Sequence, residues 1–274
     1  MSASVTDGYA RTPSTRPVRI RIGAAFPARI ASRSAALVAL ACVWELLSRT
    51  GAVNPLFLPP FSVVVANIYH GFTTGYLAHH VVASLGRAVP GLLLALLVGV
   101  PLGLVLGASR SLNTFIDPVV EVLRNTSALA LLPVFTLMLG IGETSKIAMV
   151  FYAALWPILL GTMSGLKGVD PLWIKAGRSM GLSGGKLFIK IVIPASLPSI
   201  FTGIRLAAAA GLLVLVAAEM VGSRAGLGYV INAAQLDFDL PGMYAAILVL
   251  SVVGYVTNAA LVLVETHFLR WKAS

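Results

Sequence analysis

The sequence predicts an all-α integral membrane protein. Hydrophobic residues make up 58% of the 274-residue chain, and charged residues only 11%. A soluble domain usually carries about 25% charged residues, so this chain has too few to coat a water-soluble globule. The alternation of apolar and polar residues that barrel strands need is absent, which leaves helices to cross the membrane. This composition excludes a cytosolic enzyme, a disordered chain and a disulfide-stapled secreted module.

Six apolar stretches are expected to cross the bilayer, a distance that takes about 20 residues of helix. They lie at residues 35–47, 88–108, 118–140, 147–166, 200–222 and 243–264. The first is short and contains Glu45, and the third carries Glu121 and Arg124 near its start. The second has small residues at four-residue spacing, namely Ala95, Gly99, Gly103 and Gly107. This stripe lets another helix approach closely. We expect that helix to belong to the same chain, with a subunit interface as the alternative.

The positions of lysine and arginine predict the topology, because both are enriched in cytoplasmic loops. With a cytoplasmic N-terminal arm, 16 of the 20 basic residues fall on the cytoplasmic side: six in the arm, two in the first inner loop, six in the second and two at the C-terminus. The other four, Arg49, Arg87, Lys146 and Arg224, fall on the outer side or at its interface. We expect both termini to be cytoplasmic. Residues 1–33 would form a flexible basic arm near anionic lipid, and residues 34–274 the transmembrane domain.

The inner loop at residues 167–198 is too long and too regular for a plain connector. Asp170 is suited to cap a helix, and Pro171 to occupy its first position. The expected helix continues to Met180, and the following glycines end it. A second short helix is expected at residues 186–193, ending at Pro194 because proline disrupts helices.

The first of these helices is amphipathic. Leu172, Ala176 and Met180 stack on one face, away from Lys175 and Arg178. The pattern fits a helix that docks into a groove of another protein and fits equally a helix that rests on lipid head groups.

The inner loop resembles the motif of binding-protein-dependent ABC importer permeases. That motif reads Glu-Ala-Ala, three residues, Gly, nine residues, Ile, one residue, Leu-Pro. This chain has the same spacing, with Lys175-Ala176-Gly177, Gly181, Ile191 and Ile193-Pro194. The resemblance extends from Trp44 to Trp271 and is closest to the nitrate, sulfonate, taurine and bicarbonate branch. It is carried by PLGLVLGASR (101–110), LGIGETSKI (139–147), IVIPASLPSIFTGIRLA (191–207) and AAEMVGSRAGLGYVI (217–231).

The resemblance implies a type I ABC importer permease with a cytoplasmic coupling helix, in a bacterial plasma (inner) membrane. Two permease copies, identical or different, would form the pore, and ABC ATPase subunits would dock on the inner loop and carry the ATP and magnesium. An extracytoplasmic solute-binding protein would deliver a small anion such as a sulfonate, taurine, nitrate or bicarbonate. The residues assigned to ATPase coupling are Lys175, Ala176, Gly177, Arg178, Gly181, Leu182, Ile191 and Pro194.

The chain itself is expected to be neither an enzyme nor a binder of metal, cofactor or nucleic acid. ATP hydrolysis would need the phosphate-binding motif G-x-x-x-x-G-K-[ST]. The nearest string, GLSGGKL, begins at Gly181, and its last residue, Leu187, cannot ligate magnesium.

Candidate pore or gate residues are Asn125, Thr126, Ser127, Thr136 and Glu219. In the resembled branch the third span often begins R-x-I-P-x-L-A. Here Ser127 replaces the proline, so three polar residues follow one another near membrane depth, and this departure bears on substrate choice. We expect Glu219 to pair with Arg224 or Arg87, because an anionic solute needs hydrogen-bond donors and not a carboxylate.

A self-sufficient secondary transporter is the alternative function. Such transporters usually show internal repeats and broken helices with ionisable groups at the midplane, and no repeat is evident here. A membrane-embedded enzyme is disfavoured, because the spans hold no paired carboxylates, H-E-x-x-H motif or Ser/His/Asp set. The glycine-jointed inner loop is required only by the permease.

Overall fold

A computed structural model describes residues 25–54 and 56–269, with the side chains of α1 described from Ala35 onward. The elements in chain order are α1 (Ala25–Arg49), α2 (Phe61–Thr73), α3 (Tyr76–Ala108), α4 (Arg110–Asn125), α5 (Leu132–Leu139), α6 (Glu143–Lys167), α7 (Pro171–Ser179), α8 (Gly184–Leu187), the π-helix η1 (Phe188–Val192), α9 (Ile193–Met220), α10 (Leu227–Leu236) and α11 (Leu240–Phe268). All are helical, in agreement with the predicted class. The basic arm lies outside the described residues, apart from the backbone at residues 25–33.

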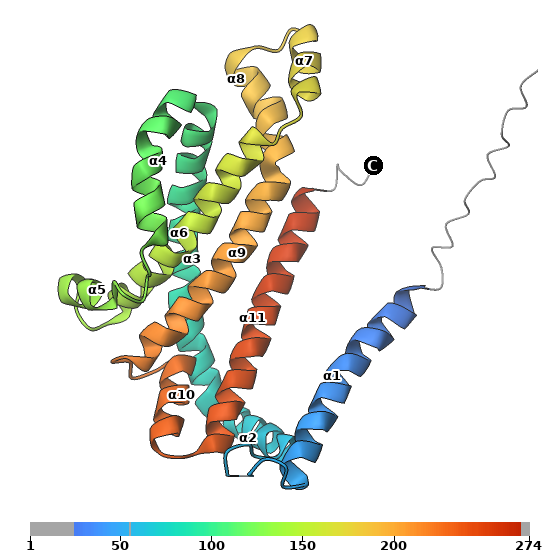
Figure 1. Cartoon of the computed structure of the whole chain (residues 1–274), viewed down its shortest axis with the longest axis vertical. Helices are drawn as coiled ribbons and strands as arrows, with labels where there is room; N and C mark the ends of the chain where they lie inside the picture. The colour runs from blue at the N-terminus through green and yellow to red at the C-terminus, as the bar shows by residue number, and fades with distance from the viewer. Residues whose placement is uncertain (1–24, 55, 270–274) are drawn as a thin grey trace, which may run out of the picture.

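Three long helices form the centre of the molecule. α6 packs along both α3 and α9 (Figure 1). Ala95, Ala154, Ile158 and Ala207 are fully buried where the three helices meet. α11 lies beside α9, and α4 and α5 lie on the opposite flank. α7 and α8 form one end of the molecule, here called the α7 end, and α2 and α10 form the other, called the α10 end.

The small-residue stripe of α3 faces α6. A Cβ atom added at Gly99 would lie 3.0 Å from Ile158. One added at Gly103 would lie 2.7 Å from the Cβ atom of Thr162 and 2.9 Å from the carbonyl oxygen of Leu159. The expectation that this stripe packs within the chain is therefore confirmed.

Gly103→Leu is expected to lower the free energy of unfolding by about 1–3 kcal/mol or more, the usual cost of overpacking a core. The added Cβ meets backbone of α6, which no side-chain rotation can move aside. Gly86→Leu is the matched control, because a Cβ there meets nothing within 4 Å. Thermal unfolding of both purified variants in detergent measures the difference. Equal midpoints would contradict the packing of α3 on α6.

Among the described residues, four helices are long and apolar enough to cross a membrane. They are α3, α6, the run from Gly184 to Met220, and α11. They contain the predicted second, fourth and sixth spans, and all but the last two residues of the fifth. The first predicted span lies in α1, whose early side chains fall outside the described part. The predicted count of six transmembrane helices is therefore not confirmed.

The third predicted span, residues 118–140, is not one helix, and the prediction of a continuous crossing there is wrong. α4 ends at Asn125, before α5 begins. Asn125 donates from Nδ2 to the carbonyl oxygen of Glu121 at 2.8 Å. Thr126 donates from Oγ1 to the carbonyl oxygen of Val122 at 3.0 Å. These side chains compete for carbonyls that would otherwise accept the amides of further helical residues, so the polar run ends the helix.

The second inner-loop helix does not end at Pro194, and that prediction is also wrong. α8, η1 and α9 form one run from Gly184 to Met220. Proline lacks the amide hydrogen and crowds the carbonyl one turn earlier. The π-turn at Phe188–Val192 contains Lys190, whose carbonyl the ring would crowd, and its wider turn makes room for the ring. The helix therefore passes through the proline and enters the membrane.

α1 departs from the bundle and is attached at its C-terminal end (Figure 1). Trp44 donates from Nε1 to the carbonyl oxygen of Pro59 at 3.0 Å, and Ser48 donates from Oγ to that of Leu58 at 2.7 Å. The Trp44 ring also packs edge-on against Tyr244, with 5.4 Å between centroids. The helix that holds the first predicted span is thus anchored at the α10 end.

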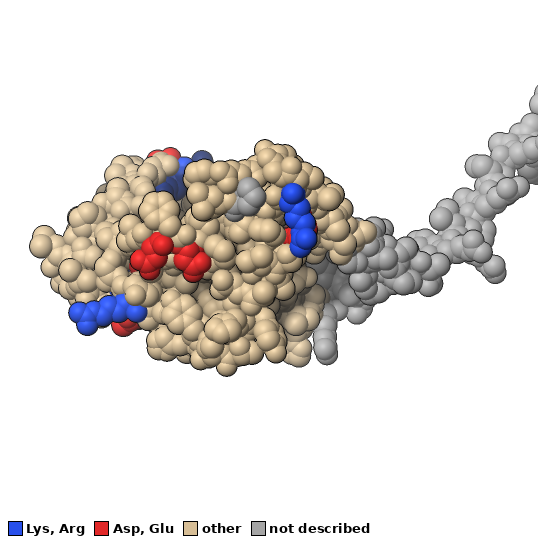
Figure 2. Space-filling view, turned by 90° about the horizontal axis from the view of Figure 1, so that it is seen from below, with Lys and Arg blue, Asp and Glu red and all other residues tan. Residues whose placement is uncertain are grey.

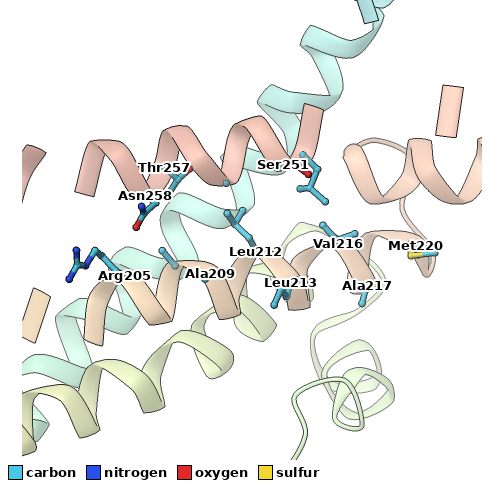
Figure 3. Close-up of a pocket in the computed structure, with 13 residues that line it drawn as sticks. Arg205, Ala209, Leu212, Leu213, Val216, Ala217, Met220, Ser251, Thr257 and Asn258 are labelled. Atoms are coloured by element: carbon cyan, nitrogen blue, oxygen red, sulfur yellow. The ribbon is translucent and has the colours of Figure 1, made fainter. Parts of the chain in front are cut away.

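α9 and α11 leave a groove of about 500 Å³ between them (Figure 3). Its lining includes Leu212, Leu213 and Val216 from α9, and Ser251, Thr257 and Asn258 from α11. Arg205 lies at one end of the groove and pairs with Glu265 at 3.2 Å. α11 also packs on α10 and α2, so the α10 end contributes strongly to its attachment.

Candidate functional site

The first candidate site is α7, the helix predicted in the inner loop. Asp170 accepts the amide hydrogen of Leu172 at 2.8 Å, and Pro171 occupies the first helical position, as expected for a capped helix start. Gly181 and Gly184 follow with φ values of +80° and +51°. Residues with side chains rarely adopt such backbone, which explains why glycines join α7 to α8.

Gly177 holds α7 close to the start of the long inner run. A Cβ added there would lie 2.7 Å from Cδ1 of Leu187 and closer still to Cδ1 of Ile191, in the π-turn. Only a glycine allows this approach without a shift of those side chains. Two residues of the predicted coupling set, Gly177 and Ile191, are therefore in direct apposition.

The apolar side chains of α7 point outward. Leu172 is 67% exposed and Met180 71%, and Trp173 is about half exposed at 49%. An apolar patch of this kind on a cytosol-facing or lipid-facing end marks an interaction surface.

Six of the eight predicted coupling residues line two depressions at the α7 end. Ala176, Ile191 and Pro194 line one shallow depression together with Trp173 and Met180. Arg178, Gly181 and Leu182 line a second one. Lys175 is exposed and lines neither. Trp173 was not among the predicted coupling residues. The available signal was a large aromatic residue next to Leu172 in a short amphipathic helix.

The second candidate site is the break between α4 and α5. The hydroxyl of Tyr152, in α6, donates to the carbonyl oxygen of Leu123 at 2.6 Å. Tyr152 lies nine residues after the start of α6 and fifteen before its end, which is about 14 Å and 22 Å at 1.5 Å per residue. The end of α4 therefore lies at mid-depth of a membrane-spanning helix. Non-helical backbone at that depth occurs only where it is buried in protein or lines a water-filled cavity.

The structure brings three of the predicted pore residues together at this break. Asn125 and Ser127 are exposed there, and Thr126 is half-buried between them. Thr136 lies separately in α5, and its hydroxyl donates to the carbonyl oxygen of Leu132 at 2.9 Å.

Glu121 and Arg124 lie in the last turns of α4, beside this break. Both were predicted near the start of the third span, but neither was assigned a function. The count of basic residues by loop included Arg124 in the first inner loop, although the predicted third span also contains this residue. α4 already begins at Arg110, directly after α3, so the chain is well into the membrane by Arg124. The available signal was the polar face formed by Asp117, Glu121 and Arg124 at helical spacing, which lowers the average hydropathy of α4.

A third cluster is a buried polar network near the α10 end. Glu219 is fully buried and accepts hydrogen bonds from Ser84 Oγ at 2.9 Å, Arg87 Nη1 at 2.6 Å and the Gly228 amide at 2.9 Å. Arg87 also donates from Nη2 to Glu143 at 2.8 Å. The expected pairing of Glu219 with Arg87 is confirmed, and Glu143 from α6 joins it.

The same network holds the segment between α9 and α10. Arg87 donates to the carbonyl oxygen of Ala225 at 2.7 Å. The amide of Gly226, where φ is +119°, donates to Nδ1 of His80 at 3.1 Å. Glu219 therefore lies inside an anchor for this turn.

The surface beyond that turn carries few charges (Figure 2). Leu236 and Phe238 are 71% and 84% exposed there, next to the exposed Asp237 and Asp239. The α10 end thus presents apolar side chains flanked by carboxylates.

Residues 99–270 match the family model described as binding-protein-dependent transport system inner membrane component. The taurine transport system permease protein TauC of Escherichia coli is 30% identical over 266 residues, which cover 95% of this chain and 92% of TauC. The nitrate import permease protein NrtB of Synechocystis is 30% identical, over 84% of this chain and 86% of NrtB.

A chain of the MetNI methionine ABC transporter, solved in an inward-facing conformation, has a similar fold. The TM-score is 0.61 at 18% sequence identity, over 70% of this chain and 95% of that one. The family model covers well over half of the sequence, and the relatives cover nearly all of it. The chain therefore belongs to the inner-membrane components of binding-protein-dependent transport systems, the pore-forming permease subunits of ABC transporters, in which a separate subunit hydrolyses ATP.

Proposed function

We propose that the chain forms one half of the pore of an ATP-driven importer for a small anion such as a sulfonate, taurine, nitrate or bicarbonate. TauC and NrtB are named for taurine and nitrate, and both solutes present several oxygens that share one negative charge. The polar break between α4 and α5 supplies hydrogen-bond donors at membrane depth. Membership of the ABC permease family rules out the alternative function, a self-sufficient secondary transporter. The break between α4 and α5, with charges nearby, is nevertheless a feature that secondary transporters often show.

The exposed apolar face of α7 carries this proposal. A short helix with glycine joints and an uncovered apolar face is suited to insert into a groove of a partner protein. We infer that the partner is the ABC ATPase subunit, which holds ATP and magnesium. Movement of α7 would reach α9 through the apposition of Gly177 and Ile191.

ATPase docking at α7 requires the α7 end to face the cytoplasm. The excess of basic residues in the inner loops supports this orientation, and with it two cytoplasmic termini in a bacterial plasma membrane. The α10 end then faces outward, where Leu236 and Phe238 would meet the extracytoplasmic solute-binding protein. A second permease copy, identical or different, completes the pore.

The double variant Leu172→Glu with Met180→Glu is expected to abolish co-purification of the ATPase subunit and uptake of the solute. Two buried carboxylates in an apolar groove would each lack a partner. Lys186→Glu makes the same change in net charge at the same end and is expected to keep the ATPase bound. Retention of the ATPase by the double variant would refute docking through α7.

The purified permease alone is expected to show no ATP turnover.

A further inference from the structure

One charged pair of α4 is exposed at mid-membrane depth. The side chains of Glu121 and Arg124 are 55% and 38% exposed. Val120, the residue before Glu121, is buried against Leu159 and Met163, so α4 packs on α6 beside this pair. Charged groups facing hydrocarbon are strongly disfavoured, and intramembrane charges usually face a bundle interior or a water-filled cavity. This face of α4 is therefore expected to meet water or protein and not lipid.

Three donors converge on the Glu121 carboxylate. Arg124 donates from Nε to Oε2 at 2.8 Å and from Nη2 to Oε1 at 2.7 Å. Asn125 donates from Nδ2 to Oε1 at 3.1 Å. A guanidinium fork binds two oxygens of one acidic group. A sulfonate or a nitrate offers two oxygens in a similar arrangement, so these donors can hold the Glu121 carboxylate or a small anion, but not both at once.

We propose that Arg124 and Asn125 form an anion-binding site of the translocation path, and that Glu121 is an internal counter-ion which the passing anion displaces. This inference rests on the proposed function. In the empty pore Glu121 and Arg124 neutralise each other. An arriving anion takes the two N–H groups of Arg124, and the Glu121 side chain turns into the water-filled path. When the anion leaves, the pair forms again.

Glu121 competes with the anion for the donors of Arg124 and Asn125, and this competition is useful in a path that the anion must also leave. A site in such a path must bind well enough to admit the ion and weakly enough to release it. A free arginine at membrane depth would hold an anion tightly. The internal carboxylate lowers the apparent affinity of the site, because binding the anion first requires breaking two charge-assisted hydrogen bonds.

The first test uses the complete complex, with its ATPase and binding protein, in proteoliposomes. Arg124→Gln is expected to reduce uptake of radiolabelled taurine or labelled nitrate about tenfold or more, while ATP hydrolysis stimulated by the loaded binding protein persists. Arg124→Lys keeps the charge without the fork and is expected to be intermediate. Arg49→Gln is the matched control, because it removes another exposed pair, with Glu45 at 2.6 Å, and leaves uptake unchanged.

The second test predicts a gain of anion affinity. Glu121→Gln frees the donors of Arg124 and Asn125, so the solubilised permease–ATPase complex is expected to bind methanesulfonate about tenfold more tightly than wild type. Adding Arg124→Gln is expected to abolish that binding. Unchanged uptake in Arg124→Gln, or no gain in Glu121→Gln, overturns the proposal. A wild-type complex that imports neither anion refutes the proposed substrate, and the methanesulfonate titration then decides the anion site by itself.

Discussion

Gly177→Leu is expected to uncouple the transporter, so that uptake falls about tenfold or more while ATP hydrolysis continues. A leucine side chain cannot fit between α7 and the π-turn, because even a Cβ lies 2.7 Å from Leu187 and closer to Ile191. α7 would remain on the ATPase but lose its contact with the start of α9. Parallel measurement of uptake and ATP hydrolysis in proteoliposomes separates uncoupling from loss of the complex.

Gly177→Ala is the control for this variant. The atoms that meet the new Cβ are the far ends of two flexible side chains, which can rotate away from a methyl group. The motif of the family has alanine at this position, which fits that tolerance. Near-normal uptake by the leucine variant would show that α7 transmits its movement through another contact.

Glu219→Ala is expected to have the largest effect on stability, about 3–5 kcal/mol, because it leaves a buried Arg87 without one of its two carboxylates. The variant also leaves Ser84 and the Gly228 amide without their acceptor. The turn between α9 and α10 would lose its anchor. Thermal unfolding of the purified complex in detergent measures this loss.

Glu45→Gln provides the comparison. It removes one partner of the Glu45–Arg49 pair, in which Arg49 is 65% and Glu45 24% exposed, and pairs at the surface contribute about 0–1 kcal/mol. A Glu219→Ala midpoint no lower than that of Glu45→Gln would mean that the buried network does not hold the α10 end together.

The elements best predicted from sequence were those with local signals. Low charge and long apolar stretches predicted α3, α6, α9 and α11. The cap at Asp170, the following proline and the glycines after Met180 predicted α7 with nearly its observed bounds. Each of these signals acts within a few residues, so a single sequence is sufficient to interpret it.

The bounds of the third span could not be predicted, because the mean hydropathy of an amphipathic helix is too low to mark it as a crossing. The polar face of α4 lowers its hydropathy, so the predicted span began at residue 118, in the middle of α4, and not at the start of that helix. The continuation through Pro194 was missed for a different reason. A π-turn is a compensating distortion of the backbone, and the sequence shows the proline but not the distortion.

The candidate sites divide in the same way. The motif spacing identified the residues around α7, because that motif lies on contiguous chain. The pairing of Glu219 with Arg87 was one of two expected alternatives. Glu143 joins that network only because of how α3 and α6 are aligned along each other. That alignment cannot be read from the residues near Glu143 in the sequence. The convergence of Arg124 and Asn125 on Glu121 became visible only once α4 was known to be helical to its last turn.

The uninterrupted run from Gly184 to Met220 has a mechanical consequence. At 1.5 Å per residue it is a rod of about 55 Å, with the π-turn beside α7 near one tip and Glu219 in the buried anchor near the other. A rod that pivots near its middle swings its two tips in opposite directions. A displacement applied at the α7 end would thus produce a displacement in the opposite direction at the α10 end, so one rigid helix could narrow the pore at one end as it widens it at the other.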